Sequence, residues 1–263
     1  MRFSKYLTMA VLLAAAGFFS ACSDDKNDPN KPGDNANYYP YETVGSYWVY
    51  ESSVIDTAGA KSDQTVDSMY VAKKENYEGK MAAFIDSYSD GEYAGTQMKL
   101  NVAGAILNAY SDMLLPVDSE GIPTDSIPKM WVTIANSGGT EWTVIPVTQL
   151  PEVPFDMGVV QGKIKLTYNA TEKKVGQENM TYQGATVKTW KYTVTNHIQG
   201  NLTITGIPTA IPLNFDVKMH VWFGENIGLM RQHVEPTVID LGPFGKTASD
   251  GSEQILIRHN IKK

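Results

Sequence analysis

The sequence predicts a mainly β protein with few helices, built as a curved antiparallel sheet or half-open barrel. The first observation is the content of aromatic residues, 14 Tyr, 5 Trp and 8 Phe, because aromatic residues favour strands over helices. The second is the alternation of apolar and polar residues along short segments, which is the period of a strand with one buried face. The third is that turn-forming Gly, Asn and Pro residues separate these segments.

Individual strands follow from that alternation. Residues 65–73 and 81–88 flank a turn-forming stretch at 75–80, so they predict a hairpin. Residues 213–223 give the clearest stripe, with Trp222 on the face opposite the apolar residues. Further strands are expected at residues 45–51, 163–168, 186–195, 202–207 and 254–261.

Two segments leave alternatives open. The apolar residues of 104–115 fit a helix, but a hairpin around Ala103 and Gly104 explains them about as well, and we expect strands. Residues 116–154 contain six of the 13 prolines. They predict either a long excursion over the sheet or a join between two similar halves of a single β-rich domain, residues 38–263.

The N-terminus predicts export. Arg2 and Lys5 precede an uncharged apolar run at 7–19 that is too short to span a bilayer, so residues 1–21 are interpreted as a signal peptide. Residues 19–22, Phe-Ser-Ala-Cys, resemble the lipobox of bacterial lipoproteins. That resemblance implies that Cys22 carries a diacylglycerol and an amide-linked acyl chain, which together anchor a protein stably to a membrane. An ordinary secretory signal and a retained helix are the alternatives.

Residues 22–37 predict a flexible acidic tether. They contain Pro29, Pro32 and Gly33 among Asp, Asn and Lys, and after Cys22 they lack a large apolar residue with which to fold. Their acidic start resembles the export signals that carry lipoproteins to the cell surface in one phylum of Gram-negative bacteria. This resemblance implies an outer-membrane, lipid-anchored protein that is exposed at the surface, whereas a plain spacer would carry no sorting information.

Sparse landmarks resemble a class of poorly characterised bacterial lipoproteins. Tyr39 and Pro40, followed by a Gly-x-x-Trp-x-Tyr strand at 45–50, look like the opening of that class. Residues 222–230 look like its closing hairpin, and 139–142 like a central Gly-x-x-Trp. The resemblance implies a fold related to the lipoprotein carriers LolA and LolB, whose concave face receives acyl chains, although the helices of those carriers are not evident.

Composition and motifs exclude several classes of function. The formal charge of −7 becomes −9 when the two cations of residues 1–21 are removed, so nucleic acid is not an expected partner. The four histidines lack the spacing of a metal site, and no cofactor loop or nucleophile motif occurs. The acidic turn of Asp86, Asp90 and Glu92 is interpreted as solvated. We therefore expect no metal, no cofactor and no enzymatic activity.

Four residues are candidate sites besides the lipidation site. Thr57, Ser68 and Ser126 each follow an aspartate and precede an apolar residue. They resemble the acceptors of the O-glycosylation system of the same bacterial phylum. Trp222 is the candidate ligand-facing aromatic, because it lies opposite the apolar stripe.

Two functions fit this sequence. The first is a non-catalytic envelope lipoprotein that binds a hydrophobic ligand or a glycan. The alternative is a structural or accessory subunit that docks onto another envelope protein. An unfilled apolar concave face would favour the first, and a packed sheet with a flat exposed patch would favour the second.

Overall fold

The computed structural model describes residues 37–111, 129–156, 161–242 and 245–262. These residues form strands and turns and contain no α-helix, which confirms the mainly β class. Accordingly, no helix in the described part of the chain has the length and apolar character needed to cross a membrane.

The structure has fifteen strands in the described residues. In chain order they are β1 (Tyr47–Ile55), β2 (Lys61–Tyr77), β3 (Lys80–Ser89), β4 (Glu92–Ala103), β5 (Ile106–Tyr110), β6 (Trp131–Asn136), β7 (Glu141–Gln149), β8 (Val153–Asp156), β9 (Gln161–Tyr182), β10 (Ala185–Ile204), β11 (Ile211–Gly224), β12 (Gly228–Val234), β13 (Thr237–Asp240), β14 (Lys246–Ser249) and β15 (Gly251–Asn260).

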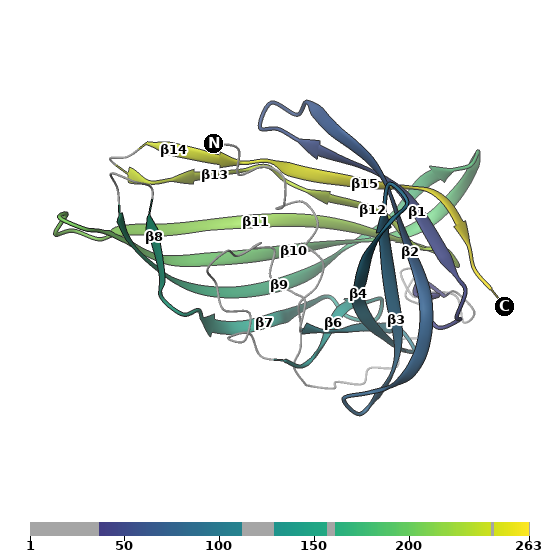
Figure 1. Cartoon of the computed structure of the whole chain (residues 1–263). Helices are drawn as coiled ribbons and strands as arrows, with labels where there is room; N and C mark the ends of the chain where they lie inside the picture. The colour runs from purple at the N-terminus through teal and green to yellow at the C-terminus, as the bar shows by residue number, and fades with distance from the viewer. Residues whose placement is uncertain (1–36, 112–128, 157–160, 243–244, 263) are drawn as a thin grey trace.

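Thirteen strands form one antiparallel sheet in the order β6-β5-β4-β3-β2-β1-β15-β12-β11-β10-β9-β7, and β8 also pairs with β9. The C-terminal strand β15 lies between β1 and β12 and joins two meanders, while β13 and β14 form a separate ribbon. Figure 1 shows the sheet curling, with β1–β4 crossing the direction of the long strands β9–β11. This confirms the curved antiparallel sheet of the half-open barrel.

The curl brings the two ends of the sheet together. β6 and β7 occupy opposite ends of the strand order, yet residues 137–140 join them directly. The Trp142 indole N–H donates to the Thr133 carbonyl (3.1 Å), and the Lys174 ammonium donates to the Ser137 carbonyl (2.8 Å). Residues 129–149 therefore connect the two edges.

Turn residues explain the hairpins. Between β2 and β3, Glu78 and Gly79 both have positive φ, 46° and 77°, as a two-residue turn with right-handed strand twist requires. The predicted hairpin is thus confirmed. Gly104 (φ 60°) turns β4 into β5, so the described part of 104–115 forms the expected hairpin rather than a helix.

The prediction of a separate strand at residues 202–207 is wrong. Residues 202–204 continue β10, whose predicted range ended at 195, and residues 205–207 leave the strand. Gly200 does not break β10, because it allows β9 to approach: a Cβ there would lie 2.0 Å from the Lys165 carbonyl oxygen.

Aromatic residues fill the inside of the curl. Tyr38, Tyr39 and Tyr41, which precede β1, are each 3% exposed or less. The Tyr39 ring lies edge-on to Phe223 (centroids 5.2 Å apart), and the Tyr41 hydroxyl accepts the Leu229 N–H (2.7 Å). The N-terminal landmark Tyr39 is therefore a core residue, and its burial supplies much apolar contact area.

Candidate ligand-binding cleft

The described residues of the concave interior line a small cavity. A cavity among Tyr41, Phe223 and Leu229 measures only 20 Å³, roughly the space of one water molecule. An acyl chain does not fit there, so the concave site implied by the resemblance to carriers is not formed by these residues.

The sheet instead opens where β12 ends. β12 pairs with β11 as far as Val234 opposite Met219, and the Glu235 N–H then donates to the Lys218 carbonyl (2.9 Å). Pro236 follows, and β13 leaves to pair with β14. In the described residues no ladder joins β13 to β11, so a cleft separates them.

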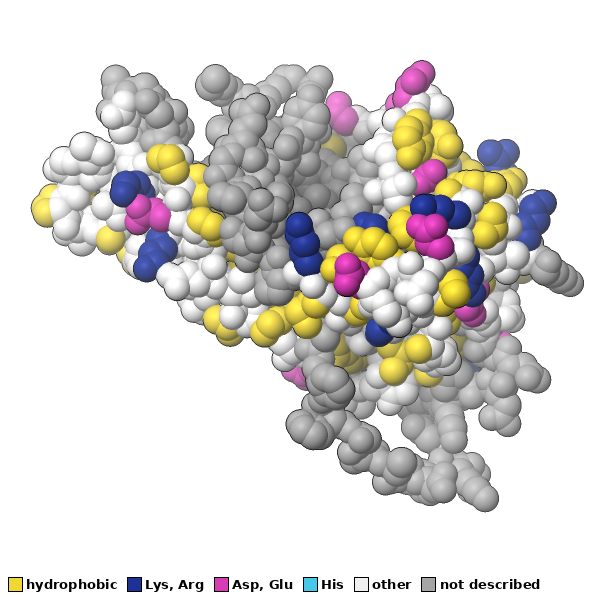
Figure 2. Space-filling model, turned by 60° about the horizontal axis from the view of Figure 1, so that its bottom comes forward, with side chains coloured by type: hydrophobic (Ala, Val, Ile, Leu, Met, Phe, Trp, Pro, Cys, Tyr) yellow, Lys and Arg dark blue, Asp and Glu magenta, His cyan; other side chains and the backbone are white. Residues whose placement is uncertain are grey.

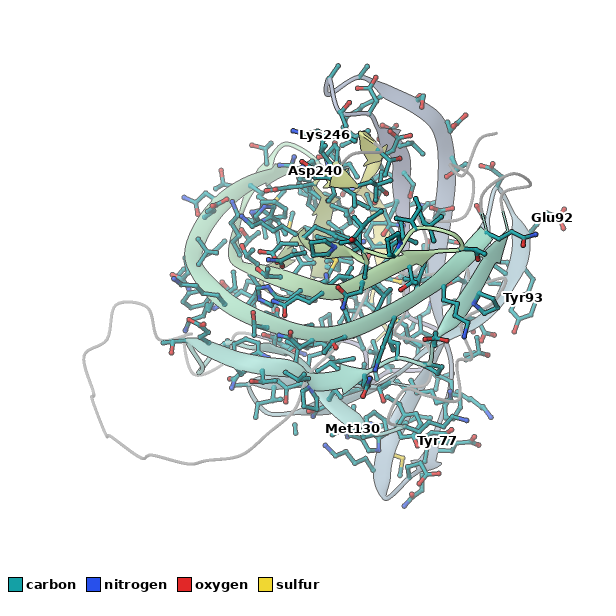
Figure 3. All side chains as sticks on the ribbon, turned by 90° about the vertical axis from the view of Figure 1, so that its left-hand side faces the viewer. Tyr77, Glu92, Tyr93, Met130, Asp240 and Lys246 are labelled. Atoms are coloured by element: carbon teal, nitrogen blue, oxygen red, sulfur yellow. The ribbon has the colours of Figure 1, made fainter. Side chains whose placement is uncertain are left out.

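This cleft is a substantial apolar cavity. Its volume is 770 Å³, within the range of roughly 300–1,000 Å³ that is usual for small-molecule sites. Figure 3 views the molecule from this end and shows Asp240 with Lys246 on the β13–β14 ribbon. The lining residues are Ile207, Thr209, Ala210, Ile211, Pro212, Asn214, Asp240 and Gly242.

The local sequence keeps the cleft open. Pro212 lacks the N–H that a neighbouring strand would need, and proline within a sheet is confined mainly to edges. Gly242 turns the chain after β13 with a φ of 61°, and a Cβ there would lie 3.8 Å from Ile211 Cγ2. These residues end regular pairing on both sides of the cleft.

Asp240 is the charged side chain among the lining residues. Its Oδ1 accepts the Gly242 N–H (2.8 Å), and its Oδ2 lies 4.0 Å from Lys246 Nζ. Both side chains of this pair are more than 60% exposed, so the pair is weak. The site can therefore hold an apolar body and one basic or hydrogen-bond-donating group.

The structure places Trp222 away from this cleft, on the outer face of β11 as predicted. The side chain is only 5% exposed, because Lys191 Nζ and the Arg231 guanidinium each lie 4.8 Å from its ring. Its N–H donates to Glu178 Oε2 (2.9 Å). In this conformation these side chains cover the Trp222 ring, and its role as a ligand-facing residue stays a prediction.

The candidate glycosylation residues differ in access. Thr57 is exposed in the turn after β1, whereas Ser68 is half-buried within β2 and pairs with Val49 and Tyr88. Ser126 and Cys22 lie outside the described residues. Of the two described acceptors, Thr57 is the more accessible to an enzyme.

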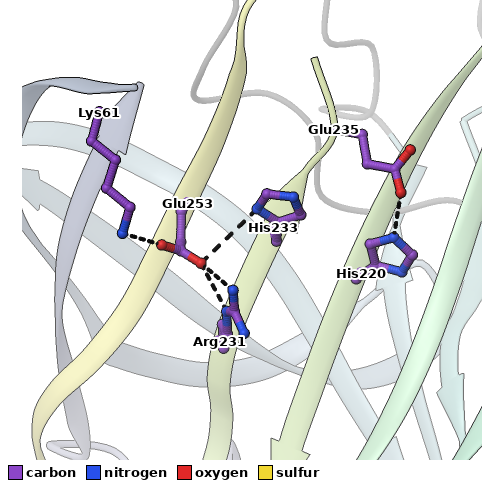
Figure 4. Close-up of polar contacts among 6 residues, drawn as sticks. All are labelled: Lys61, His220, Arg231, His233, Glu235 and Glu253. Atoms are coloured by element: carbon purple, nitrogen blue, oxygen red, sulfur yellow. Dashed lines mark hydrogen bonds and ion pairs between the residues drawn. The ribbon is translucent and has the colours of Figure 1, made fainter. Parts of the chain in front are cut away.

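The outer face carries a polar cluster, shown in Figure 4. Glu253 accepts hydrogen bonds from Lys61 and Arg231, and His220 and His233 stack with ring centroids 6.2 Å apart. Burial favours a higher pKa for Glu253, but the hydrogen bonds from Lys61 and Arg231 outweigh burial and lower the pKa. Burial lowers the pKa of His233.

This cluster does not form a metal site. His220 Nε2 lies 2.8 Å from Glu235 Oε1, and no group of three metal-ligating side chains converges among the described residues. The contacts of Glu253 could not be predicted from residue spacing, because Lys61 and Arg231 lie on strands that are distant from it in the sequence.

Glu172 was not predicted from the sequence. This side chain is 1% exposed, neither carboxyl oxygen has a hydrogen-bond partner among the described residues, and burial raises its pKa well above the usual range. Glu172 shares the inward face of β9 with Tyr168 and Ala170, so the alternation along β9 was the available signal.

Hydrophobic side chains on the face shown in Figure 2 are interspersed with Lys, Arg, Asp and Glu. Lysines also cover aromatic rings of β3 and β6: Lys73 Nζ lies 4.3 Å from the Phe84 centroid, and Lys80 Nζ lies 5.5 Å from Trp131. On the described part of the face in Figure 2, charged side chains therefore separate many of the hydrophobic ones.

No family profile and no curated protein matches the chain. A "putative lipoprotein" of Parabacteroides distasonis is 13% identical, with a TM-score of 0.46 over 87% of this chain and 100% of that one. A "putative exported protein with YmcC-like fold" of Bacteroides fragilis is 11% identical, with a TM-score of 0.41 over 86% and 99%. At these TM-scores the likeness defines no family for this chain, and the resemblance to LolA and LolB stays a prediction.

Proposed function

We propose that this chain is a non-catalytic, lipid-anchored binding protein of the bacterial cell envelope, and that its cleft holds an apolar ligand. Cys22 is the proposed lipid attachment site, and residues 23–37 are the tether. The outer membrane is the proposed location, with the domain facing the cell surface. This location is supported by the N-terminal sequence.

The cleft between β11 and β13 carries the proposal of ligand binding. The cleft has a volume of 770 Å³ and a mainly aliphatic lining, and it lies at the open end of the sheet. Binding of an apolar ligand is favourable there, because it removes apolar surface from water. Asp240 stands without a second ionisable partner among the lining residues. Asp240 is proposed to bind a basic or hydrogen-bond-donating group of the ligand.

Nile red, an uncharged apolar dye, tests the proposal. The protein used is the mature chain with Cys22→Ser, which needs no detergent. We expect saturable dye fluorescence, and we expect Ala210→Glu to weaken dye affinity at least tenfold, because the bound dye would desolvate the added carboxylate. Thr205→Glu is the matched control on the same exposed turn, outside the lining. Equal dye affinity in both variants would refute binding in this cleft.

A further inference from the structure

The edge of β11 that faces the cleft has unpaired backbone groups. The Lys218 carbonyl accepts from Glu235 on the β12 side, and alternate residues of a strand direct their backbone groups to the same side. The N–H and C=O groups of Asn214, which lines the cleft, therefore point into it, and those of Asp216 point to the same side of β11. In the described residues these groups accept and donate no hydrogen bond on that side.

β13 contributes a second open edge. The Leu241 N–H donates to the Gly245 carbonyl on the β14 side, so the backbone groups of Val238 and Asp240 point away from β14. β13 neighbours β11 without a ladder, and Figure 1 shows the two strands running alongside one another. Unpaired backbone donors and acceptors of Asn214 and Asp240 thus border the cleft among the described residues.

We infer that the cleft accepts an extended peptide segment of another protein, which adds to β11 as a strand. The open backbone edges require a partner with regularly spaced N–H and C=O groups, which an extended peptide has and an acyl chain lacks. The aliphatic lining suits alternate apolar side chains, and Asp240 complements one basic side chain. The inference rests on the proposed function, because the peptide is the apolar ligand of the same cleft.

The test uses a six-residue peptide of alternating threonine and valine with an N-terminal arginine. Its control is the same peptide with every second amide N-methylated, which keeps the side chains but removes one row of N–H donors. Binding to the mature Cys22→Ser chain is followed by displacement of Nile red and by hydrogen exchange of the Asn214 and Asp216 amides. We expect the first peptide to bind at least tenfold more tightly and to protect both amides.

Two variants separate the backbone and charge contributions. Asn214→Pro removes the N–H that points into the cleft and keeps the pairing of β11 with β10. It is expected to abolish peptide binding, whereas Asn214→Ala, which also replaces this lining side chain but keeps the N–H, is expected to retain peptide binding. Asp240→Asn is expected to weaken the arginine peptide about two- to fivefold, as for an exposed ion pair.

Other outcomes overturn the inference. Equal binding of the two peptides would mean apolar uptake without strand addition, and dye binding without peptide binding would mean a small ligand. A dimer that Asn214→Pro converts to a monomer would make a second copy of this chain the occupant. In all three cases the proposed function is tested separately, by whether Ala210→Glu weakens Nile red binding and Thr205→Glu does not.

Discussion

Glu172 makes stability depend on pH in a defined direction. Burial raises the pKa of this carboxyl well above its usual 4.5, so between that value and the folded-state pKa the unfolded chain ionises while the folded chain stays protonated. Stability from this residue is therefore present below about pH 4.5 and is lost as pH rises. Glu172→Gln should raise the free energy of unfolding at pH 8, by about 1–3 kcal/mol.

Urea unfolding at pH 4 and pH 8 measures this effect. At pH 4 the variant and the natural chain should differ little, because Glu172 is then neutral in both states. The exposed Glu141→Gln serves as the control for removing a carboxylate. A stability difference that is the same at both pH values would contradict this account of Glu172.

At the residue scale, the sequence predicted which faces are apolar but not how polar side chains are satisfied. The stripe that includes Met219 and Val221 is buried as predicted. Trp222 lies on the predicted face, yet Lys191 and Arg231 cover it. These cations come from β10 and β12, so only the sheet register brings them together.

At the scale of an element, β10 depends on a glycine that lets β9 approach. Gly200→Ala would place its Cβ 2.0 Å from the Lys165 carbonyl oxygen and 3.0 Å from Leu166 Cα. These are backbone atoms, which move only if the two strands separate. We expect a loss of about 1–3 kcal/mol in the free energy of unfolding.

Gln199→Ala is the matched control for that substitution. Gln199 is the exposed neighbour in the same strand, so its replacement should change the free energy of unfolding by less than about 0.5 kcal/mol. The urea midpoint measures both variants. Equal midpoints for the two would show that β9 and β10 are not held at this close approach.

Element types were predictable where turn chemistry and alternation agreed, as in the β2–β3 and β4–β5 hairpins. The length of β10 was not predictable. A glycine within a strand marks either the end of the strand or a close approach of a neighbouring backbone, and the sequence does not distinguish the two. The cleft was not predicted either. The sequence contains Pro208, Pro212 and Pro236 near the cleft. Which strand loses a hydrogen-bonding neighbour at each proline depends on the order of strands in the sheet.

At the scale of the whole molecule, the curl and the cleft are linked. The aromatic residues that precede β1 fill the interior, and β6 meets β7 to bring the edges together. The cleft lined by described residues lies outside the curl, beside β11. The sequence was sufficient to predict a curved antiparallel sheet, whereas the position of the cleft could be found only from the order of strands in the sheet.

Native mass spectrometry of the mature Cys22→Ser chain, exported to a bacterial periplasm, tests ligand binding most directly. We expect an apolar or peptide adduct on the chain with the natural cleft residues and on the Thr205→Glu variant, and no adduct on the Ala210→Glu variant. An adduct that persists unchanged in Ala210→Glu, or a ligand-free mass for every form, would contradict a ligand-binding cleft between β11 and β13.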